Sequence, residues 1–134
     1  MISWQAKALN LFLKQSVKRV IDNANNIDKL RKQLKVFDKF TFNISSMIEQ
    51  SRITRAGMPC DEFKMRGSNT HKTLLYIHGG AFVFKTPGLH NGFLARLVGR
   101  LDLHAIAPDY PLAPEHPFPA AIDGCFELYK SLLE

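Results

Sequence analysis

The chain has 134 residues, a net charge of +6, 46% apolar residues and 22% charged residues. This balance is close to that of globular proteins, so it excludes a disordered or low-complexity chain, and the length suits one small domain. Its apolar runs, such as residues 74–77, are much shorter than the ~20 residues of a membrane-spanning helix, so no span is predicted. Lys7 and Lys14 interrupt the stretch in which a signal peptide would need an unbroken apolar segment.

The number of cysteines indicates the redox conditions in which the protein folds. Cys60 and Cys125 are too few for a disulfide framework, and they have no spacing typical of a zinc site. They fit buried thiols in a reducing environment, which predicts a cytoplasmic protein. No pattern indicates a phosphate loop, a nucleotide site or a metal site, so no cofactor is expected.

Positive charge is concentrated in the first half of the chain. Residues 1–70 hold 13 Lys and Arg against 6 Asp and Glu, a balance of +7, whereas residues 71–134 hold 5 against 6, a balance of −1. A basic half could bind nucleic acid or an anionic membrane surface. We favour a solvated helix face, because no aromatic residues interleave with the basic ones as a base-stacking platform would need. Nucleic acid is therefore not an expected partner.

Two amphipathic helices are predicted near the start of the chain. From Ile2 to about Ile21, apolar residues recur at helical spacing, with lysines roughly opposite them. A second helix is predicted from Ile27 to about Phe40, with Asn25 as its cap and Asp28 in a position like that of a capping box. Both helices have an apolar stripe that needs a surface to cover.

From about Ser51 the apolar period changes to that of strands. The predicted order is strand, strand, strand, helix, strand, helix, over residues 51–55, 61–65, 73–77, 91–101, 103–107 and 119–134. A turn is expected at Gly57–Pro59, and the continuous apolar run 73–77 predicts a strand buried on both faces. A hairpin followed by alternating strands and helices predicts an α/β fold, with an antiparallel first hairpin and parallel strands after it.

A glycine motif follows the apolar run directly. The strand leads into His78-Gly79-Gly80-Ala81-Phe82. Ligands bind at the carboxyl ends of parallel strands in an open α/β sheet, and glycine lets another group approach the backbone closely. Two successive N–H groups in such a loop can form an oxyanion hole for a tetrahedral acyl intermediate. Taken alone, these residues fit a plain Gly-Gly turn equally well.

A second motif follows the next buried strand. Residues 109–121 read Asp-Tyr-Pro-Leu-Ala-Pro-Glu-His-Pro-Phe-Pro-Ala-Ala, with four prolines from Pro111 to Pro119. So many prolines make a stiff, largely non-helical connection. One predicted helix separates this segment from the glycine motif.

Together the two motifs resemble the α/β-hydrolase fold and, within it, the hormone-sensitive lipase family of carboxylesterases. That family has His-Gly-Gly-Gly after its third strand and Asp-Tyr-Arg-Leu-Ala-Pro-Glu-His-x-Phe-Pro after its fourth. The resemblance covers residues 51–134, which would form a partial hydrolase core with the first four strands and two helices. Residues 1–50 resemble, more loosely, the two-helix N-terminal part of the family's cap.

The resemblance implies roles for single residues. Gly79 and Gly80 would be the oxyanion-hole donors, with Ala81 in the same loop. His78 would hold the loop in shape, and Phe82 would line the substrate pocket. The residues implied to anchor the second motif beneath the site are Asp109, Tyr110, Glu115 and His116.

Two positions depart from the family's pattern. Ala81 stands where the third glycine would be, and it keeps its backbone N–H. Pro111 stands where the family has Arg, so a side chain that could pair with a carboxylate is missing. The anchoring of this loop is therefore expected to differ.

The catalytic triad of the family is not among these residues. Its nucleophile is the Ser of Gly-x-Ser-x-Gly after the fifth strand, followed along the chain by Asp or Glu and then His, and no serine here has that flanking pattern. The resemblance therefore implies an N-terminal segment of a serine carboxylesterase or lipase that acts on small acyl esters. The segment is expected to be inactive alone.

Other interpretations stay open. The chain could be a truncated or degenerate non-catalytic product, or an interaction module that uses its basic N-terminal helices. By resemblance, the fourth strand pairs between the second and the third, and a fifth strand would pair with the third. Residues 73–77 would then be an open apolar edge, so self-association of the isolated chain is expected.

Overall fold

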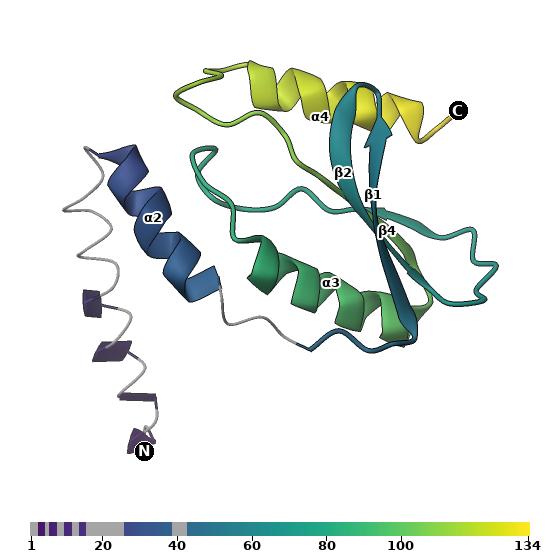
Figure 1. Cartoon of the computed structure of the whole chain (residues 1–134), viewed down its shortest axis with the longest axis horizontal. Helices are drawn as coiled ribbons and strands as arrows, with labels where there is room; N and C mark the ends of the chain where they lie inside the picture. The colour runs from purple at the N-terminus through teal and green to yellow at the C-terminus, as the bar shows by residue number, and fades with distance from the viewer. Residues whose placement is uncertain (1–2, 5, 8–9, 12–13, 16–25, 39–42) are drawn as a thin grey trace. The chain divides into compact units, whose positions relative to one another are not determined.

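The computed structural model divides the chain into two compact units, residues 1–37 and 38–134. The residues that it describes are 3–4, 6–7, 10–11, 14–15, 26–38 and 43–134. Figure 1 shows the second unit as a sheet with a helix on either side.

The main described element of the first unit is helix α2, Ile27–Asp38. Its cap is Asn26, whose Oδ1 accepts a hydrogen bond of 2.9 Å from the backbone N–H of Lys29. The predicted cap, Asn25, lies outside the described residues. The predicted first helix, residues 2–21, also lies largely outside them, although the described positions from 4 to 15 are helical. The assignment of residues 1–50 to a cap therefore stays a prediction.

The second unit is built on a mixed four-stranded sheet in the order β1-β2-β4-β3. The strands are β1, Ile48–Arg55; β2, Met58–Met65; β3, Thr73–Leu75; and β4, His104–Pro108. The pairs β1–β2 and β2–β4 are antiparallel, whereas β3 and β4 are parallel. The predicted α/β fold is confirmed, as is the place of the fourth strand between the second and the third.

The hairpin turn falls one residue earlier than the sequence indicates. Arg55 pairs directly with Met58, so the loop consists of Ala56 and Gly57, with φ of 50° and 72°. A two-residue hairpin of this kind needs positive φ at both positions, which Gly57 adopts freely and Ala56 at some cost. The turn predicted at 57–59 is therefore wrong in place, because Met58 and Pro59 already belong to β2.

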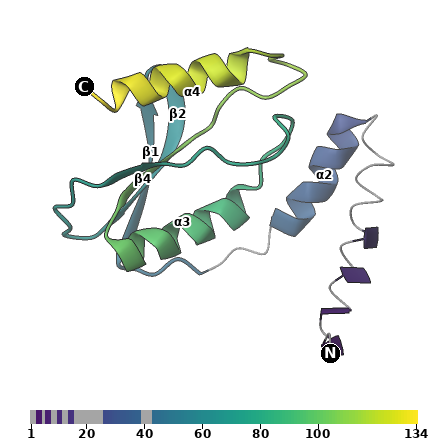
Figure 2. The ribbon, with the colours of Figure 1, turned by 180° about the vertical axis from the view of Figure 1, so that it is seen from behind.

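Two helices cover the opposite faces of the sheet, as Figures 1 and 2 both show. Helix α3 is Pro87–Leu101 and helix α4 is Ala120–Ser131. Helix α3 begins earlier than the predicted residue 91, because Pro87 occupies the first turn, where its fixed φ suits a helix and its missing N–H costs nothing. Pro119 directly precedes α4, close to its predicted place.

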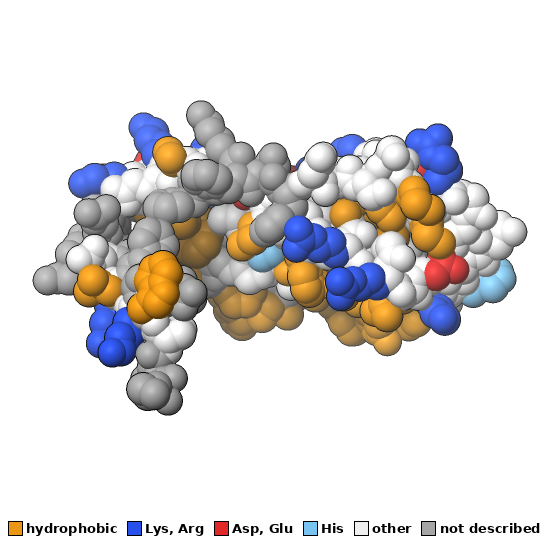
Figure 3. Space-filling view, turned by 90° about the horizontal axis from the view of Figure 1, so that it is seen from below, with side chains coloured by type: hydrophobic (Ala, Val, Ile, Leu, Met, Phe, Trp, Pro, Cys, Tyr) orange, Lys and Arg blue, Asp and Glu red, His pale blue; other side chains and the backbone are white. Residues whose placement is uncertain are grey.

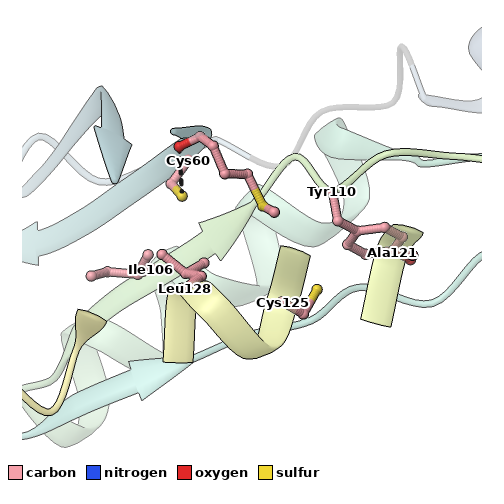
Figure 4. Close-up of a cluster of buried hydrophobic side chains, with 7 residues drawn as sticks. Cys60, Ile106, Tyr110, Ala121, Cys125 and Leu128 are labelled. Atoms are coloured by element: carbon pink, nitrogen blue, oxygen red, sulfur yellow. Dashed lines mark hydrogen bonds between the residues drawn. The ribbon is translucent and has the colours of Figure 1, made fainter. Parts of the chain in front are cut away.

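The alternation of side chains along the strands separates two hydrophobic cores. One core joins α3 to one face of the sheet through Ile48, Phe63, Leu94, Ala95, Val98 and Ala105. The other joins α4 to the opposite face through Met58, Cys60, Ile106, Tyr110, Ala121, Cys125 and Leu128 (Figure 4). Neighbouring residues such as Ala105 and Ile106 therefore serve different cores, as successive residues of a strand must. Both cysteines are free and buried, and burial raises the pKa of each thiol.

Strand β3 lies at the open edge of the sheet. The run 73–77 predicts a strand buried on both faces, and the structure contradicts this. Leu74 and Leu75 are half-buried, and the side chain of Ile77 is 50% exposed. The apolar pattern shows that these residues are suited to burial. In the described sheet, however, β3 has a neighbouring strand, β4, on one side only.

The helices also leave apolar side chains at the surface. On α4 and just beyond its end, the exposed ones are Ile122, Phe126, Tyr129 and Leu133. On α3 they are Leu89, Phe93 and Leu101, and Figure 3 shows apolar patches beside Lys and Arg side chains on the side where α3 lies. No helix in the described part of the chain is long and apolar enough to cross a lipid bilayer.

The open edge predicts self-association of the isolated chain. Strand β1, at the other edge, carries Glu49, Arg52 and Arg55, whereas the β3 edge carries no charge from Thr73 to Ile77. Ile77→Lys is expected to shift the chain toward monomer in sedimentation velocity runs over a range of concentrations, because it puts a charge on the unprotected edge. Thr54→Lys, on the exposed and already charged β1, is the matched control and should behave like the wild type. A wild-type chain that is monomeric at every concentration would contradict the prediction.

Candidate functional site

The glycine loop, defined as residues 78–85, leaves the sheet directly after β3. The backbone N–H of Tyr76 still donates to the carbonyl of Ile106, at 2.8 Å, so pairing with β4 continues to the edge of the loop. The chain then turns tightly around Gly80, whose carbonyl accepts hydrogen bonds from the N–H groups of Val83 and Phe84, at 2.9 and 3.1 Å. This turn places the loop at the carboxyl end of a parallel strand, as predicted.

Gly80 is the position at which the loop requires glycine. Its φ is 143°, and a Cβ there would lie 1.9 Å from the carbonyl oxygen of Phe84. A Cβ on Gly79 would meet nothing within 4 Å. Ala81 and Phe82 follow with φ of 51° and 60°, a left-handed conformation that costs on the order of 1 kcal/mol or more per non-glycine residue. The loop therefore stores strain that other contacts must offset.

Three successive backbone N–H groups in the loop are not used by the fold. Among the hydrogen bonds of the described residues, none has the N–H of Gly79, Gly80 or Ala81 as its donor. Gly79 and Ala81 are exposed, and Gly80 is half-buried. N–H groups that donate neither in the ladder nor within the turn remain able to donate to a ligand with negative charge.

His78 and Tyr110 hold the start of the loop. The two rings stack with centroids 4.3 Å apart, and the Tyr110 hydroxyl donates a hydrogen bond of 2.7 Å to the backbone carbonyl of His78. His78 Nδ1 lies 2.9 Å from the carbonyl oxygen of Gly79, and because a carbonyl only accepts, Nδ1 carries the proton. His78 is buried, at 9% exposure, which fits its predicted role as a support for the loop.

The middle of the loop is tied to the proline-rich segment, defined as residues 109–119. The N–H of Ala113 donates to the carbonyl of Phe82, at 2.8 Å. The ring of Phe82 is 53% exposed and contacts Tyr110 edge-on, with centroids 6.3 Å apart. Half of this residue is thus open to solvent and available to a bound molecule.

The end of the loop is held by an ionic chain, defined as Lys85, Asp109, Arg52 and Asp61. Asp109 accepts hydrogen bonds from Lys85 Nζ and from Arg52 Nη2, the latter at 2.5 Å, and Arg52 Nη1 reaches Asp61 at 2.9 Å. Burial opposes the ionisation of Asp109, but the hydrogen bonds from Lys85 and Arg52 outweigh it and hold the pKa of this carboxyl below its usual range. These contacts supply the anchoring for which the sequence offers no arginine at Pro111.

A pocket of about 170 Å³ opens beside the ionic chain. Its lining includes Arg52, Lys85, Asp109, His78 and His90. Tyr76 Oη and His90 Nδ1 share a hydrogen bond of 2.8 Å, and burial lowers the pKa of His90, as does the nearby His78 side chain. Within the described residues, no group of three or more His, Cys, Asp or Glu side chains could hold a metal ion.

The structure brings most of the predicted site residues together. His78 and Phe82 contact Tyr110, and Gly79, Gly80 and Ala81 lie between them in the same loop. The side chains of Glu115 and His116 are instead exposed on the proline-rich segment. Lys85 and Arg52 are missing from the sequence prediction. No sequence pattern marks Lys85 as part of the site. Arg52 can be assigned to the site only when the hairpin register is known, because that register sets it opposite Asp61.

Comparisons with known proteins give this geometry a context. Residues 74–134 match a family model described as the α/β-hydrolase fold. The chain is 42% identical over 81 residues to an esterase of Acinetobacter venetianus, which covers 60% of this chain and 26% of that protein. It is 41% identical over 56 residues to the hormone-sensitive lipase of Bos taurus, which covers 42% of this chain and 7% of the lipase.

Solved structures agree with the sequence comparisons. An esterase of the bacterial hormone-sensitive lipase family superposes with a TM-score of 0.72 at 26% identity, covering 81% of this chain and 36% of that chain. A hormone-sensitive lipase from a metagenome library superposes with a TM-score of 0.71 at 27% identity, covering 90% and 42%. The chain thus spans about a quarter of the Acinetobacter venetianus esterase and less than half of each of these two structures.

The neighbouring glycines of the loop give a first test of its geometry. Gly80→Ala is expected to lower the free energy of unfolding by about 2 kcal/mol or more, because the new Cβ meets the Phe84 carbonyl and the positive φ becomes strained. Gly79→Ala, where the Cβ has open space, should change it by less than about 1 kcal/mol. Urea denaturation measures both. Equal effects of the two substitutions would contradict this loop conformation.

The ionic chain predicts an acid-sensitive contribution to stability. Since the pKa of Asp109 is lowered by folding, its ionic contacts stabilise the fold above about pH 4 and are lost as the pH falls through the folded pKa. Asp109→Asn should cost about 1 kcal/mol at pH 7, a modest figure because Lys85 and Arg52 are partly exposed. It should also flatten the decline in stability as the pH falls below about 4. Urea midpoints across this range that fall as steeply as those of the wild type would count against it.

Proposed function

Because residues 74–134 belong to the α/β-hydrolase fold family and resemble its hormone-sensitive lipase type, we propose that this chain supplies the oxyanion hole of a serine carboxylesterase or lipase. The proposed substrates are small acyl esters. In this proposal residues 51–134 are part of the hydrolase core, and residues 1–50 are the helical part of a cap over the site. The family itself supports an ester hydrolase, and the roles of single residues rest on the geometry of the loop.

The observation that carries the proposal is the set of unused amides at Gly79, Gly80 and Ala81. When a serine oxygen attacks an ester carbonyl, the carbonyl oxygen becomes an anion in the tetrahedral intermediate. The N–H groups of Gly79 and Gly80 donate to that oxyanion, with the N–H of Ala81 beside them. Removal of one such donor in a serine hydrolase typically costs a factor of about 10²–10³ in rate.

Preorganisation gives the amides their catalytic value. Donors that are already fixed before the reaction need no reorganisation when the charge develops. The stack of His78 on Tyr110 fixes the start of the loop, and the bond from Ala113 fixes Phe82. The half-exposed ring of Phe82 then forms a wall against which an acyl or alcohol group packs.

In this proposal, the nucleophile, the acid and the base come from outside these 134 residues. No serine in the sequence lies in Gly-x-Ser-x-Gly, so the chain lacks the nucleophile motif of this family. Water would deacylate the enzyme in the second half of the reaction, with the triad base activating it. The proposal needs no cofactor for either step.

A fusion protein tests the proposal. The full chain alone is expected to show no measurable hydrolysis of a short p-nitrophenyl ester. The same chain is then joined to the part of the Acinetobacter venetianus esterase that follows the matched segment. The fusion is expected to hydrolyse the ester, and hydrolysis should be lost when the nucleophilic serine of the esterase part is replaced by alanine.

Variants in the fusion separate the loop from the scaffold. Gly80→Ala should lower kcat by about 10²-fold or more, because it displaces the amides. Gly99→Ala, on α3, is the control, since its Cβ would meet only the Ile48 side chain at an ordinary 3.5 Å. A folded fusion without serine-dependent activity, or a Gly80→Ala fusion as active as the unmodified one, would overturn the proposal. So would serine-dependent hydrolysis by the chain alone.

A further inference from the structure

Two consecutive residues hold the two ends of the glycine loop. Tyr110 binds the start of the loop through the carbonyl and the ring of His78, and Asp109 binds its end through Lys85. The distance between the ends is therefore set by two neighbours in the chain. A loop closed in this way has little freedom to change the direction of the amides between its ends.

Asp109 is itself fixed to the sheet. Its backbone N–H donates to the carbonyl of Pro59 on β2, at 2.8 Å, and its carboxylate accepts from Arg52 on β1. Arg52 and Asp61 are direct partners in the β1–β2 register, so the ion pair between them spans one rung of the hairpin. The ionic chain thus begins on a rigid element and ends on the loop.

Lys85 is the member of the ionic chain that belongs to the glycine loop. It follows Phe84, whose N–H and carbonyl both belong to the turn around Gly80: the N–H donates to Gly80, and the carbonyl occupies the space next to its α-carbon. A shift of Lys85 would therefore shift Phe84 and reopen the turn.

We propose that Lys85 is a positioning residue for the oxyanion hole, and that through Asp109 and Arg52 it fixes the loop amides to the β1–β2 hairpin. The inference rests on the proposed function for its catalytic meaning, but its structural content stands on the contacts alone. Lys85 touches neither substrate nor reacting atoms in this scheme. Its effect reaches the reaction through the direction of the N–H groups.

The magnitude of these contacts separates positioning from plain stabilisation. The side chains of Lys85 and Arg52 are 39% and 49% exposed, and ion pairs of this exposure add little to global stability. Loss of the Lys85 contact should therefore leave the unfolding midpoint nearly unchanged. It should show instead in the local opening of the loop, which takes much less free energy than global unfolding.

The first experiment measures that opening in the full chain. Hydrogen–deuterium exchange with mass spectrometry follows peptides that contain Val83 and Phe84, whose N–H groups are protected by the Gly80 carbonyl. In Lys85→Met, their exchange is expected to be roughly fivefold faster, because the loss of the ion pair with Asp109 makes local opening easier. The Met side chain is similar in length to that of Lys but carries no charge. Lys85→Arg should restore the wild-type rate.

The matched control is Lys130→Met. Lys130 has an exposed side chain paired with Glu127 on α4, at 2.7 Å, so the substitution removes an ion pair of similar exposure that does not involve the loop. Its exchange in the loop peptides should equal that of the wild type. Equal exchange in Lys85→Met and the wild type, or an equal increase in the Lys130→Met control, would overturn the proposal.

The second experiment uses the fusion with the esterase part. Lys85→Met should lower kcat about fivefold with KM within twofold, and Lys85→Arg should recover most of kcat, as expected for an interaction that acts on the transition state. If the unmodified fusion is inactive, the proposed function fails, and the exchange data still decide the positioning role. If the fusion is active and Lys85→Met alters neither exchange nor kcat, the positioning role fails alone.

Discussion

The contact between the proline-rich segment and the glycine loop is the interaction on which the site depends. Ala81 and Phe82 have positive φ, which costs free energy at non-glycine positions. Without this contact, nothing would offset that cost, and the loop would relax to another conformation. Asp109 and Tyr110 offset this cost by binding the two ends of the loop, while Ala113 binds its middle. The stiffness of the prolines matters because a flexible partner would follow the loop rather than hold it.

The fold explains how the two segments come to face each other. Both segments follow the carboxyl ends of adjacent parallel strands, β3 and β4, so they start at the same end of the strands. Helix α3 connects the strands on one face, and α4 follows the proline-rich segment onto the other (Figure 1). The glycine loop is thus supported from the side of β4, and in the described part of the chain β3 has no further strand beside it.

Sequence patterns could predict the loop and its main partner, but not the ionic chain. The apolar run before His78 and the prolines after Asp109 are local signals, and both lead to the observed places. The contact of Arg52 with Asp109 depends on a hairpin register that a two-residue turn at Ala56 and Gly57 sets, and the sequence suggests that turn one residue late. The exposure of Ile77 could not be predicted from the sequence either, because an apolar pattern does not show whether a strand has a neighbouring strand on both sides.

The most direct test of the account is a crystal structure of the fusion enzyme whose serine has reacted with an alkyl phosphonate. A phosphonyl oxygen then stands where the oxyanion of the tetrahedral intermediate would be. The account predicts this oxygen about 3 Å from the backbone nitrogens of at least two of Gly79, Gly80 and Ala81. An oxygen held by other donors, with these three N–H groups turned away from it, would contradict the account.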